Sequence, residues 1–186
     1  MRGRATIPTD PNLDHDSTPR VMIYDYHQDD PKKCTSARLE KLHLVETLHS
    51  LRQIPRSAII LNPVCNKTIS FQDRLTIEQY GLVGIDCSWN RAESVFQENM
   101  RGDHRRLPTL LAGNPTNYSI RGRLSTAEAL SAALMIVGYN QRALQLLRIF
   151  KWGETFLTLN KEPLREYAKT PPDLMVSCER EYFPTE

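Results

Sequence analysis

The chain has 186 residues, of which 40% are hydrophobic and 25% charged, values typical of a globular protein with one sizeable core. Its 24 basic and 22 acidic side chains leave a net charge of +2, which neither requires nor excludes a nucleic-acid partner. No apolar run approaches the roughly 18 residues of a membrane span, so we expect no membrane association.

The N-terminal residues and the cysteines predict the cellular setting. Residues 1–19 are polar and contain several prolines, which predicts a disordered or extended tail and no secretory signal. The cysteines are widely spaced and form no Cys-x-x-Cys pair; they are Cys34, Cys65, Cys87 and Cys178. This spacing predicts reduced thiols in a cytoplasmic protein, and it argues against a zinc site.

Strands and helices alternate along the first part of the chain. Apolar runs predict strands at residues 21–26, 58–61, 82–86 and 107–112. Helix starts are predicted at Thr35 or Ser36, at the capping box of Ser70 and Asp73, and at Asn90.

The C-terminal third is predicted to be helical. Ser125 and Glu128 form the clearest capping box, and further helices are predicted at residues 141–150, 153–159 and 163–168. The whole pattern predicts an α/β fold with a largely parallel sheet.

The loops that leave the predicted strands are the candidate site, because ligands of open parallel sheets bind beyond the carboxyl ends of the strands. These loops span residues 29–39, 62–67, 86–90 and 113–128. They contain no Gly-x-Gly-x-x-Gly fingerprint or Walker lysine, which counts against a dinucleotide or a P-loop nucleotide. No His-x-x-x-His spacing indicates a catalytic metal.

The stretch "GLVGIDCSWN" at residues 81–90 ends a predicted buried strand in a polar cluster. A nucleophilic Cys87 would need a positioned base, and no such signature is present, so a packed side chain is favoured. Asp86 could accept a proton or hold a substrate N–H, or it could cap the next helix. Trp89 could be a core residue or could stack on a base.

Basic side chains occur in several of the same loops. They are Lys32, Lys33, Lys67, Arg101, Arg105, Arg106, Arg121 and Arg123. If the loops converge at one edge of the sheet, these charges would surround one cleft and suit a phosphate backbone. Scattered solubilising charge explains them equally well.

Six ordered motifs between Met22 and Tyr167 carry a family resemblance. They are "YDYHQDDPKKCTSARL", "LNP", "GLVGIDCSWN", "RRLPTLLAGNPTNY", "LSTAEALSAAL" and "FKWGETFLTLN". Together they resemble the small-subunit rRNA aminocarboxypropyltransferases. The resemblance implies a SPOUT-like parallel sheet with a deep C-terminal trefoil knot. Residues 20–102 would form an N-terminal α/β subdomain, and residues 103–186 a mostly helical subdomain that completes the knot and the donor cleft.

The resemblance also implies a reaction. S-adenosylmethionine would donate its 3-amino-3-carboxypropyl (acp) group to a 1-methylpseudouridine of small-subunit rRNA during ribosome biogenesis, and methylthioadenosine would be released. No metal is implied, and we expect a monomer that acts on rRNA or a pre-ribosomal particle. Two alternatives stay open: a SPOUT-class RNA methyltransferase with the same donor, and a non-catalytic RNA-binding assembly factor.

The matched motifs assign roles to individual residues. The expected adenine walls are Leu61, Pro63, Trp89 and Ala92, with backbone groups of Leu110 and Leu111 as polar partners. Backbone near Ile85 and Leu110 is expected to bind the ribose. The expected partners of the amino-acid end are Thr35, Ser88, Ser125 and Thr126, helped by the dipole of the helix that begins near Ser125. Asp86 is the candidate base or hydrogen-bond acceptor for the acceptor nitrogen. The expected phosphate contacts are Lys32, Lys67, Arg105, Arg106 and Arg121.

Overall fold

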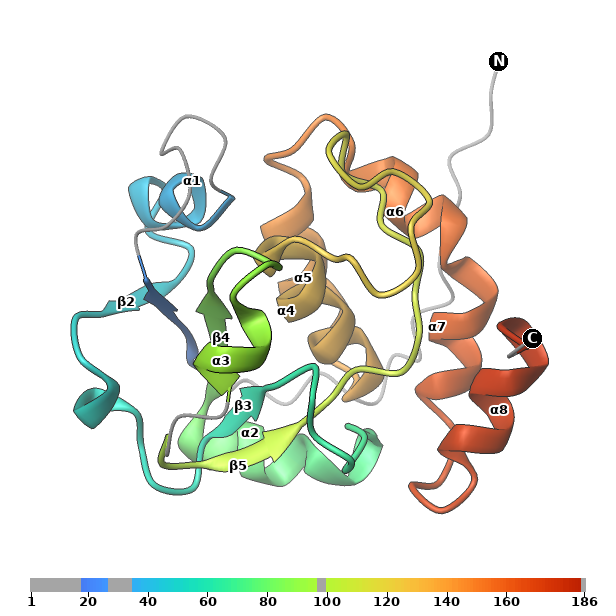
Figure 1. Cartoon of the computed structure of the whole chain (residues 1–186), viewed down its shortest axis with the longest axis horizontal. Coiled ribbons are helices and arrows are strands. Elements are labelled where there is room, and N and C mark those ends of the chain that lie inside the picture. Colours follow the sequence, from blue (N-terminus) through green and yellow to red (C-terminus); the bar gives the residue numbers. More distant parts are fainter. Residues whose placement is uncertain (1–17, 27–34, 97–99, 185–186) are drawn as a thin grey trace.

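The computed structural model describes residues 18–26, 35–96 and 100–184. Within them, five parallel strands form one sheet in the order β2-β1-β4-β3-β5 (Figure 1). The strands are β1 (Val21–Asp25), β2 (Glu46–Leu48), β3 (Ile59–Leu61), β4 (Leu82–Asp86) and β5 (Asp103–Arg105). The helices are α1 (Thr35–Lys41), α2 (Arg74–Tyr80), α3 (Ala92–Phe96), α4 (Thr126–Ile136), α5 (Asn140–Leu147), α6 (Gly153–Leu159), α7 (Lys161–Tyr167) and α8 (Met175–Tyr182), with short 3-10 turns at Leu51–Gln53 and Phe71–Asp73.

Helices cover both faces of the sheet. Successive strand side chains point to opposite faces, so Val21 and Ile23 of β1 join the larger apolar cluster with α4, α5 and α7. Met22, between them, joins the smaller cluster with α3. In Figure 1, α3 lies in front of β4, and α4 lies behind it. The near-continuous apolar run of β4 is therefore explained by burial on both faces.

The centre of the sheet approaches α4 closely at Gly84. A Cβ atom at this position would lie 3.1 Å from Thr126 Cγ2 and 3.2 Å from the Leu130 side chain. The absence of a side chain at Gly84 thus lets the first turn of α4 pack against the end of β4. This contact brings Thr126 beside Asp86.

The helix starts predicted from the two capping boxes are confirmed. Both capping boxes form, Ser70 with Asp73 and Ser125 with Glu128. The predicted helix at residues 153–159 is α6. The helix α8, which follows the proline pair at residues 171–172, was not predicted.

The strand prediction at residues 107–112 is wrong. The fifth strand lies at Asp103–Arg105 instead. Pro108 has no N–H for a ladder, and side chains bind the backbone of its neighbours: Glu179 accepts from Thr109 N–H, and Asn160 accepts from Leu111 N–H. The short edge strand β2 also escaped prediction, because three residues, of which only Leu48 is buried, give no periodic signal.

The predicted SPOUT-like fold with a trefoil knot is also wrong. The described residues form a five-stranded, all-parallel sheet whose strands all precede Arg106. The C-terminal part contributes helices and an isolated bridge between Leu111 and Arg121, and the described chain gives no evidence for a knot. The knot was implied by the family resemblance alone; no residue pattern had indicated it. None of the described helices is long and apolar enough to cross a membrane.

Candidate active site

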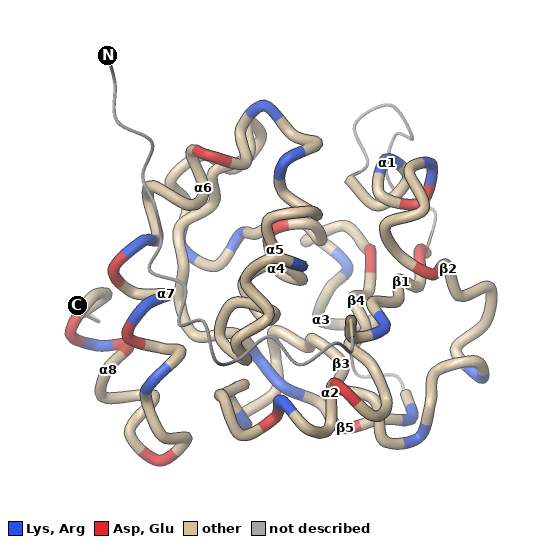
Figure 2. Tube along the Cα trace, turned by 180° about the vertical axis from the view of Figure 1, so that it is seen from behind, with Lys and Arg blue, Asp and Glu red and all other residues tan. Residues whose placement is uncertain are grey.

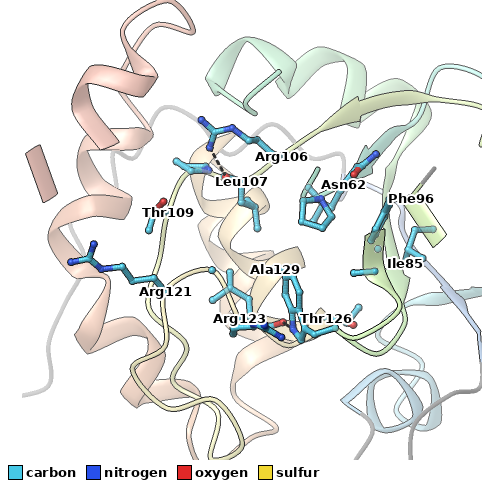
Figure 3. A pocket seen from close by; sticks show the side chains of 18 of the residues that line it. Asn62, Ile85, Phe96, Arg106, Leu107, Thr109, Arg121, Arg123, Thr126 and Ala129 are labelled. Atoms are coloured by element: carbon cyan, nitrogen blue, oxygen red, sulfur yellow. Dashed lines mark hydrogen bonds between the residues drawn. The ribbon is translucent and has the colours of Figure 1, made fainter. Parts of the chain in front are cut away.

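A cavity of about 400 Å³ opens beyond the carboxyl ends of β3 and β4, between α3 and the segments 106–109 and 121–124. Figure 3 shows Asn62, Ile85 and Phe96 on one side of it and Arg106, Thr109 and Arg121 on the other. Its position is the one that an open parallel sheet favours for a ligand. Six of the predicted donor residues line it: Leu61, Pro63, Ile85, Trp89, Ala92 and Thr126.

The Asp86 carboxylate lies at the end of β4, beside the cavity residues Ile85 and Thr126. Asp86 is 8% exposed, and its Oδ1 accepts a hydrogen bond of 2.8 Å from Thr126 Oγ1. Asp25 is its partner in register on β1, so a second carboxylate ends the neighbouring strand. The sequence analysis did not single out Asp25. Asp86 is thus held in place by α4, as a group that accepts a proton or a hydrogen bond must be.

Trp89 forms a half-buried wall of the cavity. Its Nε1–H donates to the carbonyl of Leu124 at 3.2 Å, and the Arg123 guanidinium lies 5.4 Å from the ring centroid. The indole is therefore fixed between α3 and the segment that precedes α4. Cys87, two residues earlier, packs against the smaller apolar cluster, as expected for a packed side chain.

The opposite wall is organised by Glu179 of α8. Its carboxylate accepts from Arg106 Nη2 at 2.9 Å, Arg106 Nη1 at 3.2 Å, Thr109 N at 2.7 Å and Thr109 Oγ1 at 2.5 Å. Burial alone would raise the pKa of the Glu179 carboxyl, but hydrogen bonds from Arg106 and Thr109 and the Arg106 charge outweigh it, so this pKa lies below its usual value. Glu179 lies outside the sequence motifs, and no sequence signal pointed to it.

The backbone N–H groups of Leu110 and Leu111 differ in whether they already have a hydrogen-bond partner. Asn160 binds both polar groups of Leu111, accepting from its N–H at 2.8 Å and donating to its carbonyl at 2.8 Å. The Leu110 carbonyl accepts from Gly122, but its buried N–H has no hydrogen-bond partner among the described residues. Neither residue lines the cavity; Leu110 directly follows the lining residue Thr109. Of the two, only Leu110 keeps an unpartnered N–H for the predicted adenine contact.

The predicted partners of the amino-acid end are not all brought together. Thr35 begins α1, and Ser88 lies in the turn between β4 and α3; neither lines the cavity. Buried Glu128 accepts from both the N–H and the hydroxyl of Ser125, at 2.7 and 2.8 Å. This carboxylate already occupies the N-terminus of α4, which weakens the case for a ligand carboxylate there.

The predicted phosphate contacts differ in how far they are exposed. Lys67 and Arg121 are exposed, and Arg106 is half-buried against Glu179. Arg105 is buried and forms an ion pair with Asp73 at 2.9 Å, so its placement does not support an RNA contact. Lys32 lies outside the described residues.

Positive charge gathers locally at the cavity. Lys and Arg residues are spread over many elements of the chain (Figure 2). Three arginines nevertheless line the cavity: Arg106, Arg121 and Arg123. Among the residues with described positions, no group of three His, Cys, Asp or Glu side chains could hold a metal ion.

Two family models match the chain. The one described as "Ribosome biogenesis protein, C-terminal" matches residues 59–183. The other, described as a possible Fer4-like domain in RNase L inhibitor, matches residues 19–52. Iron–sulfur clusters are held by several cysteine thiolates, and that span contains one cysteine, Cys34, so the second match carries no expectation of a cluster.

Curated relatives and a solved structure agree with the first model. The chain is 45% identical over 151 residues to a 16S rRNA aminocarboxypropyltransferase of Methanosphaera stadtmanae, covering 81% of this chain and 88% of the relative. It is 43% identical over 162 residues to the protein of that name from Saccharolobus islandicus, covering 87% and 95%. The structure of the SAM-dependent rRNA:acp-transferase Tsr3 from Vulcanisaeta distributa matches with a TM-score of 0.82 and 41% identity over 88% of each chain. The fold is therefore that of the Tsr3 structure, which replaces the SPOUT-like prediction, and the chain belongs to the family of 16S rRNA aminocarboxypropyltransferases.

Proposed function

We propose that this protein transfers the acp group of S-adenosylmethionine to a 1-methylpseudouridine of small-subunit rRNA during ribosome biogenesis. One observation carries the proposal: a cavity with an apolar side and a fixed carboxylate, Asp86, beside it, at the strand ends of a chain that is 45% identical to an aminocarboxypropyltransferase. The rRNA or a pre-ribosomal particle is the proposed partner. On the family resemblance, we also propose that the protein acts as a monomer in the cytoplasm.

The cavity fits an adenosine-bearing donor. Its volume of about 400 Å³ lies within the range of small-molecule sites. Leu61, Pro63, Trp89 and Ala92 offer flat or apolar surface to an adenine. The unpartnered N–H of Leu110, the residue after the lining residue Thr109, is the proposed polar contact to a ring nitrogen, and backbone near Ile85 is the proposed ribose contact. Thr126 is the predicted partner of the amino-acid end that lies in the cavity.

When bound, S-adenosylmethionine supplies an electrophilic carbon attached to a positively charged sulfur. The chain's part is to orient that carbon towards the acceptor and to keep the methyl group turned away, because in-line approach decides which carbon reacts. Asp86 is proposed to accept a hydrogen bond or the proton from the imide nitrogen of the uracil ring, which then forms the new N–C bond as the C–S bond breaks. Methylthioadenosine then leaves.

The phosphate backbone of the rRNA is proposed to contact the positive side of the cavity. Arg121 is exposed at the rim, Arg106 is half-buried in the wall, and Lys67 lies on the exposed loop after β3. These charges would hold the RNA near the donor without reading its sequence.

Donor labelled in two positions tests the proposal. With S-adenosylmethionine carrying label in the carboxyl group, small-subunit rRNA should become labelled; with label in the methyl group, it should not. A methyltransferase predicts the reverse pattern, and the names of the relatives do not favour it. A non-catalytic assembly factor predicts no label from either donor and unchanged RNA binding in a Trp89→Ala variant.

A further inference from the structure

The C-terminal helix α8 reaches the cavity through one side chain. Glu179 lines the cavity, and its carboxylate accepts the four hydrogen bonds from Arg106 and Thr109 described above. Its side chain is 14% exposed, and that of Arg106 is 22% exposed. Hydrogen bonds between charged groups in such partly dry surroundings are stronger than those on an open surface.

These bonds fix a segment that has no regular structure of its own. Residues 106–111 follow β5 without forming a strand, and isolated bridges hold only the two ends of this segment, from Arg106 to Thr68 and from Leu111 to Arg121. Besides Glu179, Thr109 is bound by Tyr167, whose hydroxyl donates to the Thr109 carbonyl at 3.1 Å. Thr109 directly precedes Leu110, whose N–H is the proposed adenine contact.

The C-terminal end of the described chain also contacts the rim of the cavity. Arg121 donates from Nη1 to the carbonyl of Pro184 at 3.2 Å, and its guanidinium lies 5.5 Å from the ring centroid of Phe183. The residues at and after the end of α8 thus touch a second cavity-lining arginine. Two separate contacts tie the C-terminal segment to one wall of the cavity.

We infer that Glu179 is a positioning residue for the donor: by binding Arg106 and both hydrogen-bond donors of Thr109, it holds the part of the cavity wall that directly precedes Leu110 in the chain. This inference rests on the proposed function. It gives the C-terminal segment, which lies outside the sequence motifs, a direct part in donor affinity. It does not place Glu179 in contact with the reacting atoms.

The test is the Glu179→Gln variant of the full chain, with steady-state kinetics and titration of S-adenosylmethionine. Glutamine keeps the size of the side chain but loses the charge that pairs with Arg106. The dissociation constant and the KM for the donor should rise about tenfold, because hydrogen bonds to a charged group are lost, while kcat changes less than about twofold. Glu181→Gln, an exposed glutamate of the same helix, is the matched control and should change neither value.

A purely structural role would lower the unfolding temperature and leave the donor KM unchanged at a temperature where the variant is folded; that result overturns the inference. A fall in kcat at constant KM also overturns it. If the Glu179→Gln variant does not fold, the Thr109→Val variant is measured instead. This substitution removes the shortest of the four hydrogen bonds to Glu179. An unchanged KM for the donor in this variant rejects the inference. If the wild-type protein itself does not bind S-adenosylmethionine, the proposed function fails instead.

Discussion

Thr126 donates a hydrogen bond of 2.8 Å from Oγ1 to Oδ1 of Asp86, joining the first turn of α4 to the carboxyl end of β4. Gly84 makes this contact possible, because a side chain there would press on Thr126 Cγ2. A threonine 40 residues away in the sequence and a glycine on the same strand therefore fix one carboxylate beside the cavity. The two polar residues had been assigned to different roles, catalysis and donor binding, and the structure couples them.

The Thr126→Val substitution should separate these two roles. Valine keeps the shape of threonine but cannot donate to Asp86, so the carboxylate loses its orientation. We expect kcat to fall about tenfold, which corresponds to about 1.4 kcal/mol of transition-state stabilisation. Donor titration should show a change of less than about threefold. Thr158→Val, on the exposed side of α6, is the control. A weaker donor affinity with unchanged kcat would assign Thr126 to donor binding alone.

The Asp86→Asn substitution tests the proposed base. Asparagine can still accept the hydrogen bond from Thr126, but it cannot take a proton. General-base assistance is typically worth about 10²- to 10⁴-fold, so kcat should fall by at least about 100-fold with donor binding near normal. The control is Asp103→Asn, at an exposed position at the start of β5, which should leave kcat and donor binding unchanged. Unchanged turnover would remove Asp86 from the chemistry.

Charge reversal at Arg121 and Lys67 tests the RNA contact. Each of the variants Arg121→Glu and Lys67→Glu should weaken rRNA binding and reduce the slope of log K against log salt by about one, because one phosphate contact is lost. Donor affinity should be unaffected in Lys67→Glu, since Lys67 does not line the cavity. Arg56→Glu, exposed before β3, is the control. An unaltered salt slope in both variants would place the RNA elsewhere.

Arg105 should behave as a residue of the core. Its side chain is 8% exposed, its partner Asp73 is 10% exposed, and Asp73 also accepts from Ser70 N–H in the capping box. Arg105→Met would leave a buried carboxylate without its cation, which costs about 3–5 kcal/mol of folding free energy. Denaturant unfolding measures this loss, with Arg56→Met as the surface control. A stable variant with weaker RNA binding would contradict the structural role.

Local signals in the sequence predicted local structure well. The capping boxes at Ser70 and Ser125 place helix starts because their hydrogen bonds span three residues. The apolar run of β4 predicted its burial, and its position predicted that Asp86 would end a strand beside a site. Six predicted donor residues line one cavity because parallel strands end at the same edge of the sheet.

Long-range contacts explain what could not be predicted. Glu179 reaches Thr109 across 70 residues, and the same interactions stop residues 107–112 from forming a strand. The sequence predicts that Arg105, next to Arg106, is a surface cation. In the structure it is buried in an ion pair with Asp73, which lies 32 residues earlier in the chain. Neither pairing leaves a pattern in the sequence. The SPOUT-like fold with its trefoil knot, inferred from family resemblance alone, had no residue-level support, and the structure corrects it together with the strand predicted at residues 107–112.

The central claim is tested most directly by identifying the small product that is released from S-adenosylmethionine when small-subunit rRNA is the acceptor. The purified protein is incubated with S-adenosylmethionine and rRNA that carries the acceptor nucleoside, and the small molecules are separated and identified by mass. Transfer of the acp group releases methylthioadenosine in amounts equal to the modified nucleoside, and this is the result we predict. S-adenosylhomocysteine as the product would contradict the account, because it would mean that the methyl group was transferred.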